Sequence, residues 1–336
     1  SCVIYNFIFG VGKVIKKIRS GVMKKYILKR IVYAVITIFL LMLLTYFMMH
    51  ALPGDPFVGE KAVSEATREA LRIKYGLDKS VIEQFFMYVM NVFQGDLGTS
   101  LGSNRPVLTI VTEAFPYSFE LGIRSLIFAT VGGVGLGAFA AVKRGKKGDT
   151  IAMLIAVIGV SVPSFIVAAL LQYFVSLKLQ QAIGVQIFAI SGWSDEFSKW
   201  LPSLALAFGS LATISRLMRT SMLDVLSSDY IKTAKAKGLS NKTIVWRHAI
   251  RNAIMPVITV LGPIAASVLT GAFVVEKVFA IPGMGKFFVD AITQADYPMI
   301  AGSTLFYGVF LIIATLIVDI LYGVIDPRVN IADSKE

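Results

Sequence analysis

The sequence has 336 residues, of which 56% are hydrophobic and 16% charged, and its mean hydropathy is +0.72. These values exclude an ordinary soluble domain and indicate a membrane protein. The net charge of +12 does not indicate a nucleic-acid-binding protein, because the basic residues cluster between apolar runs instead of along one soluble face. The single cysteine, Cys2, excludes a disulfide framework or a cysteine-based metal site within this chain.

Two interpretations of residues 1–22 are open. Met23 is followed by a basic segment and then by the first apolar run, which is typical of a natural start, so residues 1–22 would be an upstream extension. Alternatively, these residues form an amphipathic helix on the membrane surface. In either case we expect a cytoplasmic segment over residues 1–30 and a first span over 31–50, close to the ~20 apolar residues that a bilayer requires.

The polar segment that follows, residues 51–116, is too long for an unstructured hairpin loop. Residues 64–75 are predicted to form a helix that ends at Gly76, and residues 80–93 an amphipathic helix that ends near Gly95. We therefore expect a compact helical lid on the extracytoplasmic side.

The second predicted span, residues 117–142, carries Glu120 and Arg124 at i,i+4 on one helix face. Ionisable residues are rare at membrane depth and face protein or water. The pair would either contact a zwitterionic substrate in a translocation path or form a structural ion pair that holds two helices together, and we favour the second interpretation. Further along the span, Gly133 and Gly137 predict close helix packing.

The third predicted span, residues 150–177, has Pro163 near its middle, so we expect a kink there. The fourth span begins near Leu201, with Pro202 in its first turn. It is short for a span before charged residues appear, and we expect it to continue as a helix into the cytoplasm.

Residues 224–256 lie between the fourth and fifth apolar runs and are densely basic. Two helices are predicted here, over 229–237 and 241–252, with Gly238 ending the first and Ser240 capping the second. Small side chains in the first helix would let another protein surface approach its backbone closely. The alternative is a basic amphipathic helix on the lipid surface.

Two more spans, residues 257–275 and 299–325, complete a core over residues 117–325, and residues 326–336 form a C-terminal tail. With the N-terminus inside, the predicted cytoplasmic segments hold 22 of the 33 lysine and arginine residues. The positive-inside rule therefore predicts six spans with both termini in the cytoplasm.

No catalytic pattern is found in the sequence. The Gly-Lys pairs at 12–13 and 285–286 lack the earlier glycine and the following Ser or Thr of a P-loop, and His50 and His248 lie outside any His-Glu-x-x-His pattern. We therefore expect no enzyme activity, no cofactor and no metal site. Uphill transport would draw its energy from a partner.

Six short motifs occur along the chain: LPGDP at 52–56, DYIKTAKAKGLS at 229–240, RHAIRNAIMP at 247–256, EKVFAIPGMG at 276–285, DYP at 296–298 and DPR at 326–328. Together they resemble ABC-importer permeases, and most of all the B-type permease subunit of the peptide and nickel branch. The general family signature opens Glu-Ala-Ala and reaches glycine four residues later. In this chain the corresponding positions are Lys232, Thr233 and Ala234, followed by Gly238.

The resemblance implies six transmembrane helices of the type I importer kind in the cell membrane of a bacterium or archaeon. It implies a permease subunit that forms half of a path for dipeptides or oligopeptides. Its partners would be a second permease subunit, in a heterodimer, two ATP-binding subunits that hydrolyse ATP, and an extracytoplasmic substrate-binding protein. Nickel or another small solute is the alternative substrate, and a self-sufficient secondary transporter is the alternative of a different class.

The resemblance also implies site residues. Coupling to the ATPases is assigned to Asp229, Tyr230, Lys232, Thr233, Ala234, Lys235, Ala236 and Gly238. If the first interpretation of the charged pair holds, Glu120 and Arg124 line the translocation path.

Overall fold

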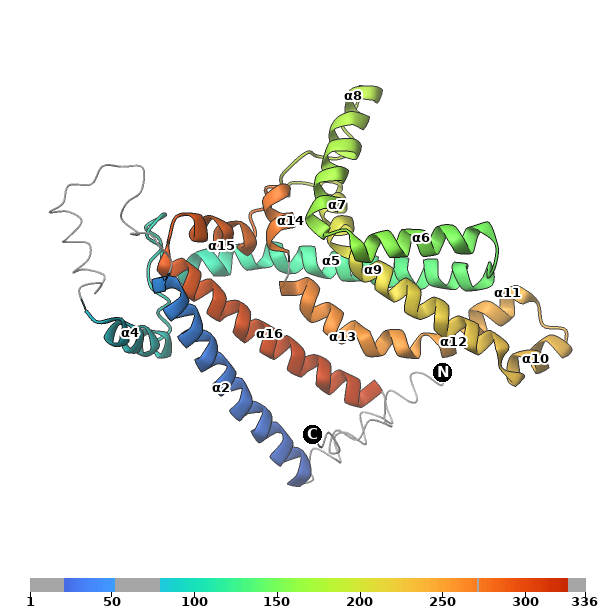
Figure 1. Ribbon diagram of the computed structural model, residues 1–336, viewed down its shortest axis with the longest axis horizontal. Helices are drawn as coiled ribbons and strands as arrows, with labels where there is room; N and C mark the ends of the chain where they lie inside the picture. The colour runs from blue at the N-terminus through green and yellow to red at the C-terminus, as the bar shows by residue number, and fades with distance from the viewer. Residues whose placement is uncertain (1–20, 52–78, 271, 326–336) are drawn as a thin grey trace. The chain divides into compact units, whose positions relative to one another are not determined.

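The computed structural model describes residues 21–51, 79–270 and 272–325 (Figure 1). Within these ranges the chain forms helices and no strand, apart from an isolated bridge between Thr99 and Pro106. The predicted all-α fold is confirmed. The first helix predicted for the lid, the residues before position 21 and the C-terminal tail lie outside the described residues.

Five helices in the described ranges are long and apolar enough to cross a membrane: Leu28–His50, Val107–Val142, Ser164–Ile183, Glu196–Ser227 and Tyr297–Ile317. A further pair, Asn241–Ala253 and Met255–Leu269, is bent by 52° and passes the same test as one broken span. The second helix of that pair overlaps the fifth predicted span, residues 257–275, whereas the first falls in the basic segment, residues 224–256.

The chain divides into two compact units. The first lies within residues 1–114 and 287–336, and the second comprises residues 115–286. Helices α5 (Val107–Val142) and α15 (Met284–Thr293) have residues in both units.

In the first unit, α2 (Gly21–Ala51) packs against α16 (Tyr297–Ile325) and against the short helix α4 (Val81–Phe93). Gly308 permits the close approach of α16 to α2, because a Cβ atom there would clash with the side chain of Leu41. The absence of a side chain at one position thus brings two predicted spans into contact.

Asp296 ties a loop of the first unit to the start of α16. Its carboxylate accepts hydrogen bonds from the hydroxyl of Ser100 (2.6 Å), from the N–H of Gly102 (3.1 Å) and from the N–H of Met299 (3.2 Å). The residue before it, Ala295, has a φ of 51°. An alanine in this left-handed region carries roughly 1 kcal/mol of strain, which the bonds to Asp296 offset.

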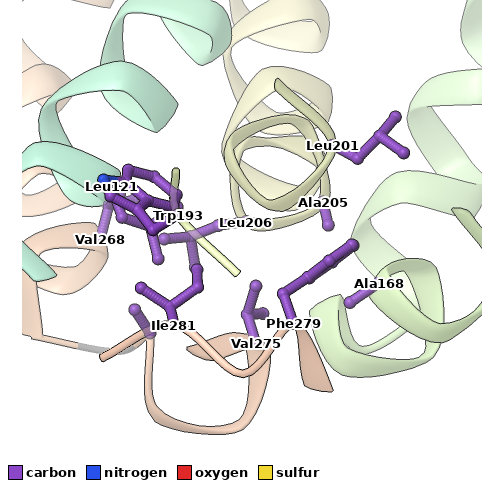
Figure 2. Close-up of a cluster of buried hydrophobic side chains, with 11 residues drawn as sticks. Leu121, Ala168, Trp193, Leu201, Ala205, Leu206, Val268, Val275, Phe279 and Ile281 are labelled. Atoms are coloured by element: carbon purple, nitrogen blue, oxygen red, sulfur yellow. The ribbon is translucent and has the colours of Figure 1, made fainter. Parts of the chain in front are cut away.

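The second unit is built around α9 (Glu196–Ser227), which packs against α6 (Lys147–Ser161), α7 (Ser164–Leu171) and α13 (Met255–Thr270). Figure 2 shows one core cluster of this unit, in which buried side chains from several helices surround the loop after α14 (Phe273–Val278). The cluster comprises Leu121, Ala168, Trp193, Leu201, Ala205, Leu206, Val268, Ala272, Val275, Phe279 and Ile281.

The prediction of close packing through Gly133 and Gly137 is confirmed. A Cβ atom at Gly133 would lie 2.7 Å from Ile214, and one at Gly137 would overlap the carbonyl oxygen of Ser215. Both contacts join α5 to α9, so these glycines set the distance between the two helices.

The helix that contains the second predicted span, residues 117–142, begins before residue 117. α5 begins at Val107, and Pro116 lies inside it. A proline inside a helix removes one backbone hydrogen bond, which neighbouring groups can replace. Pro116 therefore does not interrupt α5.

The prediction of a kink at Pro163 understates the break. α6 ends at Ser161, Val162 has extended backbone angles, and α7 starts at Ser164. Figure 1 shows α6 and α7 running in different directions. α9 also starts earlier than predicted, which places Pro202 beyond its first turn, and the helix continues to Ser227 as expected.

Candidate functional site

The segment predicted to contact an ATPase has the two-part structure that the sequence indicates. α10 (Asp229–Ala236) comes directly after α9, and Gly238 follows with a φ of 77°. Ser240 then caps the next helix, its hydroxyl accepting a bond from the N–H of Thr243. The left-handed glycine and the serine cap together set the angle between the two helices.

A small apolar cluster holds α10 in place. Ile231 and Ala234 from α10 pack with Ile244 from the following helix, against Val225 of α9. The hydroxyl of Tyr230 also accepts a hydrogen bond of 2.9 Å from the side-chain amide of Asn252. Few side chains therefore determine where α10 lies.

The outer surface of α10 consists of small side chains between lysines. The exposed residues there are Asp229, Tyr230, Lys232, Thr233, Lys235, Ala236 and Gly238. Ala234 differs from the rest of the predicted set, because it faces the apolar cluster. A surface of this kind suits a groove that admits a helix backbone closely and carries acidic groups at its rim.

The π-helix that follows was not predicted. After α11 (Asn241–Thr243), the chain forms the π-helical turn η2 (Ile244–Ala249), and α12 (Ile250–Ala253) continues from it. Such turns are rare and occur often at functional sites. This one exposes Trp246 beside the coupling segment.

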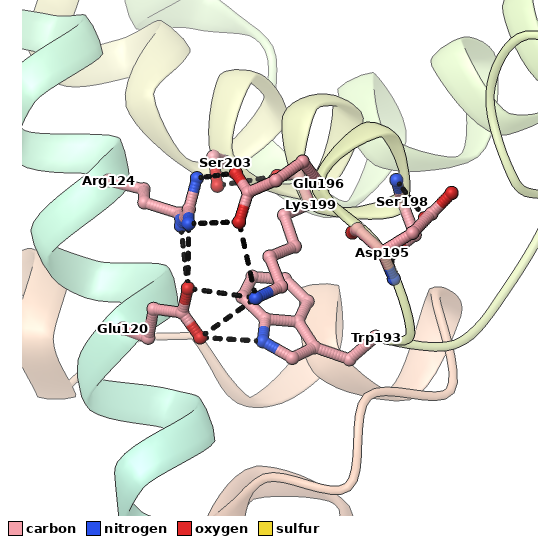
Figure 3. A network of polar contacts seen from close by, with 8 residues as sticks. All are labelled: Glu120, Arg124, Trp193, Asp195, Glu196, Ser198, Lys199 and Ser203. Atoms are coloured by element: carbon pink, nitrogen blue, oxygen red, sulfur yellow. Dashed lines mark hydrogen bonds and ion pairs between the residues drawn. The ribbon is translucent and has the colours of Figure 1, made fainter.

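Glu120 and Arg124 belong to a charged network that joins α5 to the start of α9 (Figure 3). Arg124 donates to Glu120 (2.8 Å) and makes two bonds to Glu196 (2.8 and 2.9 Å). Glu120 also accepts from the ammonium of Lys199 (3.1 Å) and from the indole N–H of Trp193 (2.9 Å). Two acids and two bases thus neutralise one another.

This network contains three residues that the sequence analysis missed: Trp193, Glu196 and Lys199. Glu196 and Lys199 lie in the first turn of α9, which the capping box of Asp195 and Ser198 fixes. The available signal was Asp195 itself, because aspartate is a preferred N-cap residue. Contact of substrate with Glu120 and Arg124 stays a prediction.

A second ion pair links α6 to α9. The guanidinium of Arg219 makes two bonds to the carboxylate of Asp149, of 2.6 and 2.7 Å. The N–H of Gly145 donates to the same carboxylate at 3.0 Å. These bonds, those from Arg219 first, lower the pKa of Asp149 to about 2. Arg219 lies on α9 between the centre of that helix and α10.

The run EKVFAIPGMG at 276–285 is organised by a buried carboxyl group. Glu276 has no exposed surface, and its carboxylate accepts a bond of 2.7 Å from the N–H of Gly285. Burial raises the pKa of Glu276 above its usual range, while bonds from Ser118 and the backbone oppose that effect. Cβ atoms at Gly283 or Gly285 would clash with this carboxylate, which explains both glycines.

Among the described residues, no group of three or more His, Cys, Asp or Glu could hold a metal ion. The features described are an exposed basic helix, α10, the charged network at the start of α9 and the Asp149–Arg219 ion pair further along it.

Comparisons with known proteins identify the family of the chain. Residues 133–331 match the family "Binding-protein-dependent transport system inner membrane component", and residues 23–122 match the N-terminal region of such components. The chain is 45% identical over 311 residues to the dipeptide transport system permease protein DppB of Bacillus subtilis, covering 92% of this chain and 99% of that protein. It is 36% identical over 311 residues to the oligopeptide transport system permease protein OppB of Salmonella typhimurium, covering 92% and 100%.

A third relative, DppB of Lactococcus lactis, is 41% identical over 310 residues, with 92% of this chain and 100% of that protein covered. These matches extend over nearly the full length of each relative and include both family regions. The chain belongs to the family of inner membrane components of binding-protein-dependent transport systems.

Proposed function

We propose that this permease carries dipeptides or oligopeptides and takes its energy from ATPase subunits that dock on α10. The observation that carries the proposal is the coupling segment, in which a short helix after α9 presents small and basic side chains and ends at a left-handed glycine. The substrate class is supported by the names of relatives that are 36–45% identical to the chain.

The proposed assembly contains a second, different permease subunit, two ATP-binding subunits and an extracytoplasmic binding protein. The chain has no P-loop, so ATP hydrolysis is assigned to the partners. The excess of lysine and arginine in alternate loops supports a topology with both termini in the cytoplasm. In that topology α10 is cytoplasmic, where an ATPase can reach it.

The network of Glu120, Arg124, Glu196 and Lys199 is proposed to hold α5 against α9 at the extracytoplasmic end. All four groups are used in bonds to one another. The charged termini of a zwitterionic peptide could bind these side chains only if existing ion pairs were broken. This supports a structural role ahead of a direct contact with substrate.

The test is uptake by the transporter reconstituted in vesicles with all its subunits. We expect ATP-dependent uptake of a radiolabelled dipeptide, competed by unlabelled peptide and dependent on the binding protein. The purified chain alone should hydrolyse no ATP. Uptake of nickel ion without uptake of peptide would show that nickel is the substrate. ATP turnover by the chain alone would refute the assignment of hydrolysis to the partners.

A further inference from the structure

Helix α4 has two apolar surfaces, of which the described residues cover one. Phe85 and Gln84 face α2 and are buried. A second set of large apolar side chains lies on another face of the helix with 59–84% of their surface exposed: Ile82, Phe86, Met90 and Phe93. Their spacing of four, four and three residues places them on one stripe along the helix.

The contacts of α4 with α2 fix its depth along the first span. The ring of Phe85 lies 6.0 Å from the ring of Phe39 and 6.0 Å from that of Phe47. Midway between these two residues, the span still has seven residues to run before its end at His50. At the helical rise this is about 10 Å of helix. Such a depth matches that of helices lying in a membrane interface, roughly 5–10 Å into the headgroup and acyl boundary.

The polar side chains of α4, among them Tyr88 and Asn91, lie outside the exposed stripe. Glu83, the only carboxylate of the helix, forms a capping box with Ser80. The side chain of Gln84 accepts a bond from the hydroxyl of Tyr46 and donates to the carbonyl of Lys79. The stripe therefore presents only apolar side chains, and a lipid contact would leave no polar group of it unpaired.

The span itself also exposes apolar side chains at this depth. Leu40, Leu44 and Met48 form a row on α2, next to the row of Phe39 and Phe47 that contacts α4, and all three expose about half or more of their surface. The two packed helices therefore both expose apolar side chains at the same depth along the span. A membrane around this part of the span would cover both sets of side chains.

We propose that α4 lies in the outer leaflet and that its stripe of Ile82, Phe86, Met90 and Phe93 contacts lipid acyl chains. The leaflet is that at the His50 end of α2, which is the outer one in the topology proposed above. Part of the extracytoplasmic region is then a membrane anchor for the rest, in place of a lid surrounded by water.

The experiment uses the full chain with the subunits that co-purify with it, in vesicles of phosphatidylcholine and phosphatidylglycerol. Cys2, the single cysteine, is replaced by serine. Phe86→Cys and Met90→Cys then carry a nitroxide on the stripe, and Asn91→Cys, also exposed but on another side of α4, is the matched control. Collisions of each label with oxygen, which dissolves in lipid, are compared with collisions with a water-soluble nickel chelate.

We expect the ratio of oxygen to nickel collisions to be several-fold higher at both stripe positions than at Asn91. Equal ratios at all three positions would overturn the proposal, because α4 would then lie in water. Exclusion of both reagents from the stripe would also overturn it, because a protein partner would then cover these side chains. The measurement needs no transport, so a wrong substrate assignment leaves it unaffected.

Discussion

Gly238→Val tests the coupling segment by changing backbone strain and little else. Gly238 has a φ of 77°, and a Cβ atom added there would meet no atom within 4 Å. The valine side chain therefore has room, and its cost comes from the left-handed backbone, about 1–2 kcal/mol. A cost of about 1.4 kcal/mol corresponds to a tenfold change in a conformational equilibrium.

The structure indicates how that strain would be relieved. α10 has no side-chain hydrogen bond at its N-cap, Ser228, and only Ile231 and Ala234 anchor it in the apolar cluster. Rotation of α10 about the glycine is therefore the easiest response. The docking-competent arrangement should fall about tenfold in population, and peptide uptake with it, while the permease accumulates in the membrane at the wild-type level.

The assay compares uptake and ATP hydrolysis in vesicles with membrane abundance measured by immunoblot. Gly238→Asn is the matched control, because asparagine tolerates the left-handed region and should retain most activity. Charge reversal at Lys235 or Lys237 should reduce uptake less than Gly238→Val. Normal uptake by the valine variant would refute the role of the segment, and equal loss with asparagine would refute strain as the cause.

Three further outcomes are expected. Asp149→Asn should lower the stability of the permease at neutral pH by up to about 2 kcal/mol, because the pair with Arg219 is lost. Since the pKa of Asp149 is lowered to about 2, its carboxylate stabilises the folded state above about pH 4, and this stabilisation is lost as the pH falls towards 2. The thermal unfolding midpoints of the variant and the wild type should therefore converge in acid. Ala295→Gly should raise the free energy of unfolding by about 0.5–1 kcal/mol, by removing left-handed strain, and a lower unfolding midpoint than wild type would contradict this. A cysteine at Gly145 should react with a membrane-impermeant maleimide only from the cytoplasmic side and one at Ser103 only from outside, and the reverse pattern would invert the topology.

Features written in a few neighbouring residues could be predicted from the sequence. The end of α10, the left-handed Gly238 and the Ser240 cap each depend on interactions within one helical turn, and all three are as expected. The packing role of Gly133 was also predictable, because a glycine within an apolar helix indicates a close neighbour without identifying it.

Features that depend on distant partners could not be predicted in this way. Glu120 and Arg124 were recognised as a pair, but Glu196 lies 72 positions from Arg124 in the sequence, and only the packing of α5 beside α9 brings them together. The passage of α5 through Pro116 depends likewise on surroundings that a single helix does not encode. The same applies to the inward position of Ala234, which follows from its contact with Ile244.

The continuity of α9 has a mechanical consequence. Its 32 residues span about 48 Å, from Glu196 and Lys199 in the charged network to Ser227, two residues before the start of α10. Arg219 lies about 34 Å along the helix from Glu196 and about 12 Å from Ser227, so a tilt of about 5° about Arg219 moves the Glu196 end by about 3 Å and the Ser227 end by about 1 Å. The Asp149–Arg219 pair lies along its length and can serve as the fulcrum. A small displacement of α10 would then produce a larger displacement at the Glu196 end of α9, while the helix keeps its shape.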